Sequence, residues 1–167
     1  VEITDALVAE LPKVPAQRQG LLIMALACRG EPRVLPTVLQ AATGGDEQLR
    51  ILAFRALKRI GDASCVPSLL DAAAEGSAEV SQAAMESLES LQDKSVDDQV
   101  AARLPKAQGK MRIVLMELVG RRRTAAAAPA LWQAADDADP AIRAAALAGL
   151  GAVVETADLP KLIARLA

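Results

Sequence analysis

Histidine and tyrosine are absent from this 167-residue sequence, which also has only one tryptophan, one phenylalanine and two cysteines. Histidine is the most common general base and metal ligand in proteins, so both kinds of site lose their usual residue. Cys28 and Cys65 do not have the C-x-x-C spacing of zinc and redox motifs, and we expect both to be small buried apolar groups. We therefore predict no catalytic residue, no metal site and no cofactor.

The sequence also lacks an excess of charge of either sign. Its 19 Lys and Arg residues and 21 Asp and Glu residues give a net charge of -2. A nucleic-acid-binding domain usually carries a basic face and aromatic side chains that stack on bases, so we expect no nucleic-acid partner. The one basic run, Arg121–Arg123, is expected to be three solvated cations at a helix C-terminus.

Long apolar runs are missing too. No stretch approaches the roughly 18 uncharged apolar residues of a membrane-spanning helix, and no signal-peptide pattern is present. We predict no membrane span and leave the cell compartment and the oligomeric state open.

Small and aliphatic residues are what the sequence has in abundance, and 52% of the chain is hydrophobic. Alanine and leucine are among the best helix formers, whereas β-branched runs bounded by turn residues are scarce. The composition therefore predicts an all-α protein.

Four prolines define a period in this sequence. The spacing from Pro36 to Pro67 is the same as that from Pro129 to Pro160, and the gap between Pro67 and Pro129 is twice as long. The proline missing from the middle of that gap would fall at Asp98. The period is about 31 residues, within the range of roughly 20 to 50 residues that is typical of proteins built from stacked structural repeats.

Other residue types follow the same period. One position of the repeat, which we call a register, is apolar in every repeat: Leu7, Val38, Leu69, Val100, Leu131 and Leu162. Another holds acidic or hydroxyl groups that suit a helix start: Glu31, Asp62, Asp93, Thr124 and Glu155. Phe54 and Trp132 also fall in apolar registers, so we predict that both lie in the core.

Each period is predicted to form two helices. The first, helix A, has the proline in its first turn, where the missing N–H would have no helical partner. The second, helix B, follows a turn and carries an apolar stripe at helical spacing. The predicted repeats are residues 1–30, 31–61, 62–92, 93–123 and 124–154, with a partial repeat at 155–167. Since the last helix A has no helix B and the sequence opens at Val1, we expect the array to be part of a longer chain.

The helix B motif is clearest at Asp139-Pro140-Ala141-Ile142-Arg143, and the helix A motif at Val66-Pro67-Ser68-Leu69-Leu70. The pattern resembles the HEAT-repeat family, in the short form found in the HEAT-like repeats of phycobilisome lyases. The resemblance covers essentially the whole chain. It implies a right-handed α-solenoid of about five stacked helix pairs plus a final unpaired helix, with the B helices on the concave side.

The resemblance also implies a ladder of Asp and Arg side chains between adjacent repeats. Its members here would be Asp46, Arg50, Arg112, Asp139 and Arg143, with a gap at Ser81.

A candidate binding surface is the side of the B helices expected to point away from the core. It is basic, then acidic, then bland along the chain: Ile51, Arg55, Lys58, Gln82, Glu86, Glu89, Ile113 and Glu117. This mixture suits a protein or peptide partner, although a merely solvated helix face is an equally good interpretation. The leading hypothesis is a non-enzymatic interaction scaffold. The alternatives are a domain of a chromophore-lyase-like enzyme, from the resemblance alone, and a nucleic-acid-binding module.

The repeat pattern is weakest between the third and fourth repeats. Ser81, Asp97, Asp98 and Ala101 all depart from their registers. We predict that any irregularity of the stack falls near residues 92–109.

Overall fold

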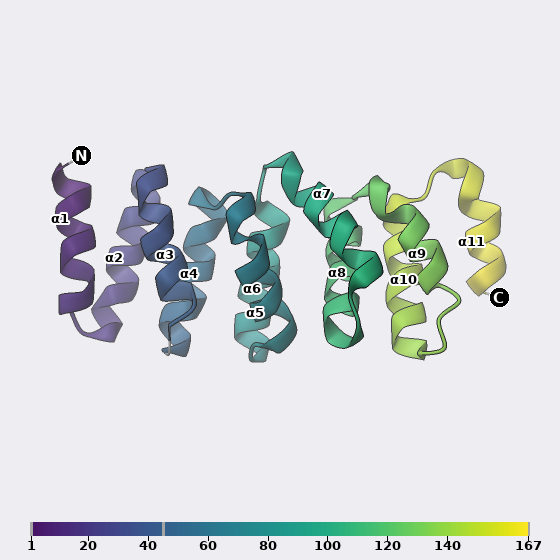
Figure 1. Ribbon diagram of the computed structural model, residues 1–167, viewed down its shortest axis with the longest axis horizontal. Helices are drawn as coiled ribbons and strands as arrows, with labels where there is room; N and C mark the ends of the chain where they lie inside the picture. Colours follow the sequence, from purple (N-terminus) through teal and green to yellow (C-terminus); the bar gives the residue numbers. More distant parts are fainter. Residues whose placement is uncertain (1, 45, 167) are drawn as a thin grey trace. The chain divides into compact units, whose positions relative to one another are not determined.

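The computed structural model describes residues 2–44 and 46–166 (Figure 1). Regular structure within these ranges consists of α-helices and short 3-10 helices. The predicted array boundaries at residues 1 and 167 lie outside the described residues. The chain divides into two compact units, Val1–Gln92 and Asp93–Ala167, and each is described by itself.

The described residues of the first unit form three helix pairs. In each pair the A helix contacts its B helix, and the B helices of successive pairs also contact each other. The pairs are α1 (Glu2–Glu10) with α2 (Ala16–Arg29), α3 (Leu35–Ala42) with α4 (Glu47–Ile60), and α5 (Val66–Glu75) with α6 (Ala78–Ser90).

Residues 93–166, the described part of the second unit, form two helix pairs and a last A helix. The pairs are α7 (Lys94–Arg103) with α8 (Gly109–Arg122), and α9 (Ala128–Ala134) with α10 (Pro140–Val153), followed by α11 (Leu159–Leu166). Helix α10 contacts α8, α9 and α11. The all-α repeat fold of five helix pairs and a final helix A is thus confirmed within the described ranges. The handedness and the concave side stay predictions.

The period prolines set how the A helices begin. Each is the second residue of its helix, and a 3-10 turn precedes it: Pro32–Val34, Ala63–Cys65, Ala125–Ala127 and Thr156–Asp158. Proline has no N–H, and its ring would clash with the carbonyl four residues earlier, so an α-helix cannot run through this position. Asp98 imposes no such limit, and α7 begins at Lys94, upstream of it.

Stacking buries the predicted apolar registers. Leu7 in the first pair is half-buried, whereas Val38, Leu69, Val100 and Leu131 are 0% exposed and Leu162 is 6% exposed. Phe54 is buried as predicted. Each repeat therefore completes its core only when a neighbour covers it.

Two predicted core residues are not in the core. Trp132 is half-buried, and its ring faces two cations of α11, with Lys161 Nζ 4.0 Å and Arg165 Cζ 5.4 Å from the ring centroid. Trp132 occupies the same position of the repeat as Leu70, which is buried. An amphipathic ring can take this position while it is only partly covered. Cys28 is exposed on α2, whereas Cys65 is buried and its burial raises the pKa of the thiol.

The first repeat of each unit departs from the others in the same way. Asp5 and Asp98 both occupy the proline register, and a Leu-Pro-Lys 3-10 turn ends both A helices, at Leu11–Lys13 and Leu104–Lys106. Both B helices end in a left-handed residue, Gly30 with φ of 67° and Arg123 with φ of 54°. Three full periods separate the two members of each matched pair. The second unit thus begins at the junction where the sequence pattern is weakest.

We predict that truncation costs more in the stacked interior than in the first repeat. Leu69→Ala should lower the free energy of unfolding by about 2–5 kcal/mol, because it removes a fully buried side chain. Leu7→Ala, in the same register of the same unit, should cost about half of that or less, because Leu7 is only half-buried. Urea denaturation followed by circular dichroism measures both. Equal losses would contradict stacking as the source of burial.

Candidate functional site

Four predicted surface residues come together on α4 and α6 of the first unit. Lys58 Nζ lies 3.3 Å from Glu86 Oε2, and Gln82 Nε2 donates a 3.1 Å hydrogen bond to Glu86 Oε1. Arg55 on α4 is exposed and adds a Coulombic attraction to Glu86. The hydrogen bonds from Gln82 and Lys58 hold the pKa of Glu86 below its ordinary value. Together with the exposed Glu89, these residues form what we call the charged face.

The charged face remains open to solvent and to a partner. The side chains of Lys58 and Glu86 are each 37% exposed. An ion pair this exposed contributes little to stability, about 0–1 kcal/mol, so either charge can be redirected to a partner at small cost.

Three other predicted residues do not join this face. Ile51 is only 3% exposed, so its predicted exposure is wrong. Helix α4 contacts α2, α3 and α6, which leaves a narrower exposed arc than helix periodicity alone suggests. Ile113 is half-buried and Glu117 is exposed on α8 of the second unit, where Glu117 Oε1 pairs with Arg121 Nη2 at 2.7 Å.

Asp46 and Asp139 act as N-caps rather than as ladder members. Asp46 Oδ1 accepts a 2.7 Å hydrogen bond from the N–H of Leu49, and Asp139 Oδ1 accepts one of 2.8 Å from the N–H of Ala141. Both bonds satisfy a free N–H of the first helical turn. The predicted pairing of these aspartates with arginines of adjacent repeats is therefore wrong.

The arginines of the predicted ladder bind backbone carbonyls instead. Arg50 Nε donates to the carbonyl of Ala42 at 3.3 Å, and Arg143 Nη1 donates to the carbonyls of Asp137 and Ala138, each at 2.9 Å. All three carbonyls lie at or after the end of a helix A, where no helical N–H is available to them. Arg50 thus ties α4 to the end of α3, and Arg143 ties α10 to the turn that follows α9.

Two further residues of this register have the same role. Ser81 Oγ donates to the carbonyl of Ala73 at 2.6 Å, and Gln19 Nε2 donates to the carbonyl of Val14 at 3.1 Å. Ser81 is therefore no gap, and Gln19 occupies the register in the first repeat. Arg112 is the exception, because its Nη1 lies 2.6 Å from Asp137 Oδ2 and so joins two successive repeats.

Family comparison agrees with this geometry. Residues 4–89 and 35–118 match the model described as HEAT repeats, and residues 123–157 match the model described as HEAT repeat. The chain belongs to the HEAT-repeat family. The predicted resemblance is thereby confirmed.

A similar solved structure is "The structure of the complex of CpcE and CpcF of phycocyanin lyase from Nostoc sp. PCC7120". The two chains are 19% identical, the match covers 98% of each chain, and the TM-score is 0.43. No curated protein has a sequence that matches this chain significantly.

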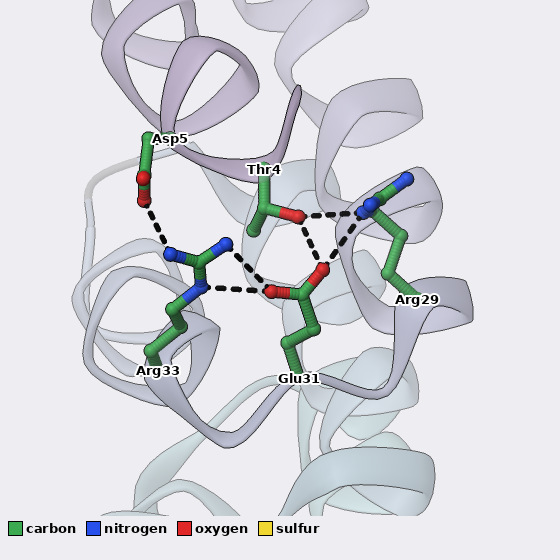
Figure 2. A network of polar contacts seen from close by, with 5 residues as sticks. All are labelled: Thr4, Asp5, Arg29, Glu31 and Arg33. Carbon is green, nitrogen blue, oxygen red and sulfur yellow. Dashed lines mark hydrogen bonds and ion pairs between the residues drawn. The ribbon is translucent and has the colours of Figure 1, made fainter. Parts of the chain in front are cut away.

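A network of polar contacts joins the first two HEAT repeats (Figure 2). Thr4, which is 0% exposed, donates its hydroxyl to Glu31 Oε1. Arg29 Nε donates to the Thr4 hydroxyl at 2.6 Å and to Glu31 Oε1 at 3.1 Å. Arg33 pairs with Glu31 Oε2 at 2.7 Å through Nη2 and with Asp5 Oδ1 at 2.9 Å through Nη1. We call this network the Glu31 clamp.

The clamp changes the acidity of its central carboxylate. The hydrogen bond from Thr4, with those from Arg33 and Arg29, lowers the pKa of Glu31 from 4.5 to about 2. Each of these donors favours the ionised form, since only the carboxylate accepts all of them at once.

The second unit has a matching clamp at its first junction. Arg122 Nε donates to Asp97 Oδ1 at 2.7 Å, and the Thr124 hydroxyl donates to the same oxygen at 3.0 Å. The separations of 25 and 27 residues equal those from Thr4 to Arg29 and Glu31, with acid and hydroxyl exchanged. Burial opposes ionisation, but the two hydrogen bonds outweigh it and keep the pKa of Asp97 low. The side chain of Arg122 is only 8% exposed, so its predicted solvation is wrong.

In the described part of the chain, no three acidic or cysteine side chains gather closely enough to hold a metal ion. None of the helices within residues 2–44 and 46–166 is long and apolar enough to cross a membrane.

The Glu31 clamp predicts a specific pH dependence. Because the folded-state pKa of Glu31 is depressed, its stabilisation is present above about pH 4.5 and is lost as the pH falls towards 2. The difference in unfolding free energy between wild type and Glu31→Gln should therefore shrink across this window in urea titrations. Thr4→Val removes the main hydrogen-bond donor to Glu31, so the pKa of Glu31 should fall less on folding and the pH range of the effect should become narrower. A difference that is the same at pH 6 and at pH 2.5 would contradict the clamp.

The tie between Ser81 and Ala73 predicts a contrast between two serines of α6. Ser81→Ala should lower the free energy of unfolding by about 1 kcal/mol, because it leaves a helix-end carbonyl without its donor. Ser90→Ala is the matched control, since Ser90 Oγ only donates back to the Glu86 carbonyl of its own helix. The control should be neutral or slightly stabilising in the same denaturation assay. Equal effects would show that the tie adds no stability.

Proposed function

We propose that this HEAT-repeat chain is a non-enzymatic scaffold that binds a protein or peptide partner through the exposed side of its B helices. The observation that carries the proposal is the charged face, where Lys58, Gln82 and Glu86 of two successive repeats are linked by side-chain contacts. Stacked B helices present such side chains at regular spacing on a rigid support.

The chemistry of the charged face favours a protein over a nucleic acid. Arg55 and Lys58 are cationic, whereas Glu86 and Glu89 are anionic, and both sets are exposed or half-exposed on neighbouring helices. A polyanion would be repelled by the acidic half, whereas a partner with separate acidic and basic groups can complement both halves. Such complementarity mainly selects a partner and speeds its approach.

The proposal is tested by exchanging the two charges of the central pair. The double variant Lys58→Glu, Glu86→Lys keeps an ion pair between α4 and α6 but reverses the order of charges presented to a partner. Capture of the partner from an extract of the source organism should fall about tenfold or more, which corresponds to about 1.4 kcal/mol.

Asp71→Lys provides the matched control, because Asp71 is an exposed acid on helix A of the same unit. The control should bind like wild type. Glu86→Lys alone should weaken binding, and Glu117→Lys tests whether the second unit takes part. If binding survives both the charge exchange and Glu86→Lys, the charged face is not the binding surface.

A further inference from the structure

A cavity of about 540 Å³ opens between the first and second HEAT repeats, at the ends of their A helices. Val8, Leu11 and Pro12 form one apolar wall, and Ala41 and Leu49 form another. Gln19, Gly44 and Asp46 lie at its polar side. None of these residues belongs to the charged face. The volume is within the range of about 300–1,000 Å³ typical of ligand sites.

The equivalent place in the second unit is crossed by an arginine. Moving three periods along the chain takes Gln19 to Arg112 and Gly44 to Asp137. Arg112 Nη1 lies 2.6 Å from Asp137 Oδ2, and both side chains are about one quarter exposed, at 23% and 24%. Two residues that line the cavity of the first unit thus correspond to two residues that are joined by an ion pair in the second.

The walls of the two places correspond as well. Leu11 and Pro12 become Leu104 and Pro105, and both segments are 3-10 turns. Asp46, the N-cap of α4, corresponds to Asp139, the N-cap of α10. The first unit therefore keeps the Leu-Pro turn and the N-cap aspartate of this place, but Gln19 and Gly44 stand where the second unit has the arginine and its acidic partner.

We propose that the cavity of the first unit binds an arginine side chain supplied by a partner peptide. Its methylene groups would lie along Leu11 and Pro12, as long cationic side chains commonly pack on apolar walls. Its guanidinium would bind Asp46, whose Oδ1 already accepts from the N–H of Leu49. Asp46 Oδ2 accepts no hydrogen bond from the described residues, which leaves an anionic acceptor at the polar side of the cavity.

The test uses the whole chain and three blocked tripeptides: acetyl-Gly-Arg-Gly-amide, the same peptide with citrulline, and the same peptide with leucine. Citrulline keeps the shape of arginine but has no charge. Two-dimensional amide NMR should show saturable shifts at Leu11, Gln19 and Asp46 with the arginine peptide. The affinity for the citrulline and leucine peptides should be at least about tenfold lower.

A filled-cavity variant provides the specific control. Gln19→Arg with Gly44→Asp copies the ion pair of the second unit into the first. A side chain at Gly44 has room, since its Cβ would lie 3.4 Å from the nearest atom, the carbonyl oxygen of Ala41. This variant should give the amide spectrum of a folded protein and should no longer bind the arginine peptide.

Asp46→Asn separates the charge from the helix cap, because asparagine is an equally good N-cap. It should weaken binding of the arginine peptide about tenfold while the amide spectrum stays that of the folded protein. The proposal is overturned if the arginine peptide causes no saturable shifts, if citrulline or leucine binds as well, or if the filled-cavity variant still binds.

Discussion

Stacking of apolar registers once per period is the constraint on which the rest of this structure depends. A single helix pair does not enclose its own core, as the half-buried Leu7 and the fully buried Leu69 of the same register show. The period must therefore be kept at each repeat, and three local features keep it. The prolines fix where helix A begins, the N-cap aspartates fix where helix B begins, and Arg50 and Ser81 tie each helix B to the preceding helix A.

Apolar contact is not directional, so it does not by itself mark where a stack starts. The Glu31 clamp and its counterpart at Asp97 are directional, and each lies at the first junction of a compact unit. They share their residue spacing, the preceding Leu-Pro-Lys turn and a left-handed helix end. A period three times as long is thus superimposed on the single HEAT repeat. The contact is the same in both units, but the acid and the hydroxyl are exchanged: Thr4 donates to Glu31 in the first unit, and Thr124 donates to Asp97 in the second.

The fold could be predicted from the sequence because the period consists of residue types that each have a single structural role. A proline, an N-cap aspartate or a leucine register has the same role in every repeat. The site could be predicted only in part. The acceptor of Arg50 is a backbone carbonyl, which has no signature in the sequence, and Ile51 is buried because α4 has neighbours on three sides. The clamps could not be predicted from the repeat pattern, because their members lie 25 and 27 residues apart rather than one full period. Asp5 and Asp98, which replace the period proline, are a sequence signal that these two repeats differ from the others.

The contact between α11 and the ring of Trp132 has a practical consequence. Trp132 is the single tryptophan of the chain and belongs to the second unit, where Lys161 and Arg165 lie against its ring. Its fluorescence should respond when α11 leaves the ring, whereas the first unit has no indole to contribute. The backbone signal, in contrast, sums the helices of both units. Comparing the two optical signals along one denaturation curve therefore reveals whether the units melt together or one after the other, without any labelled variant.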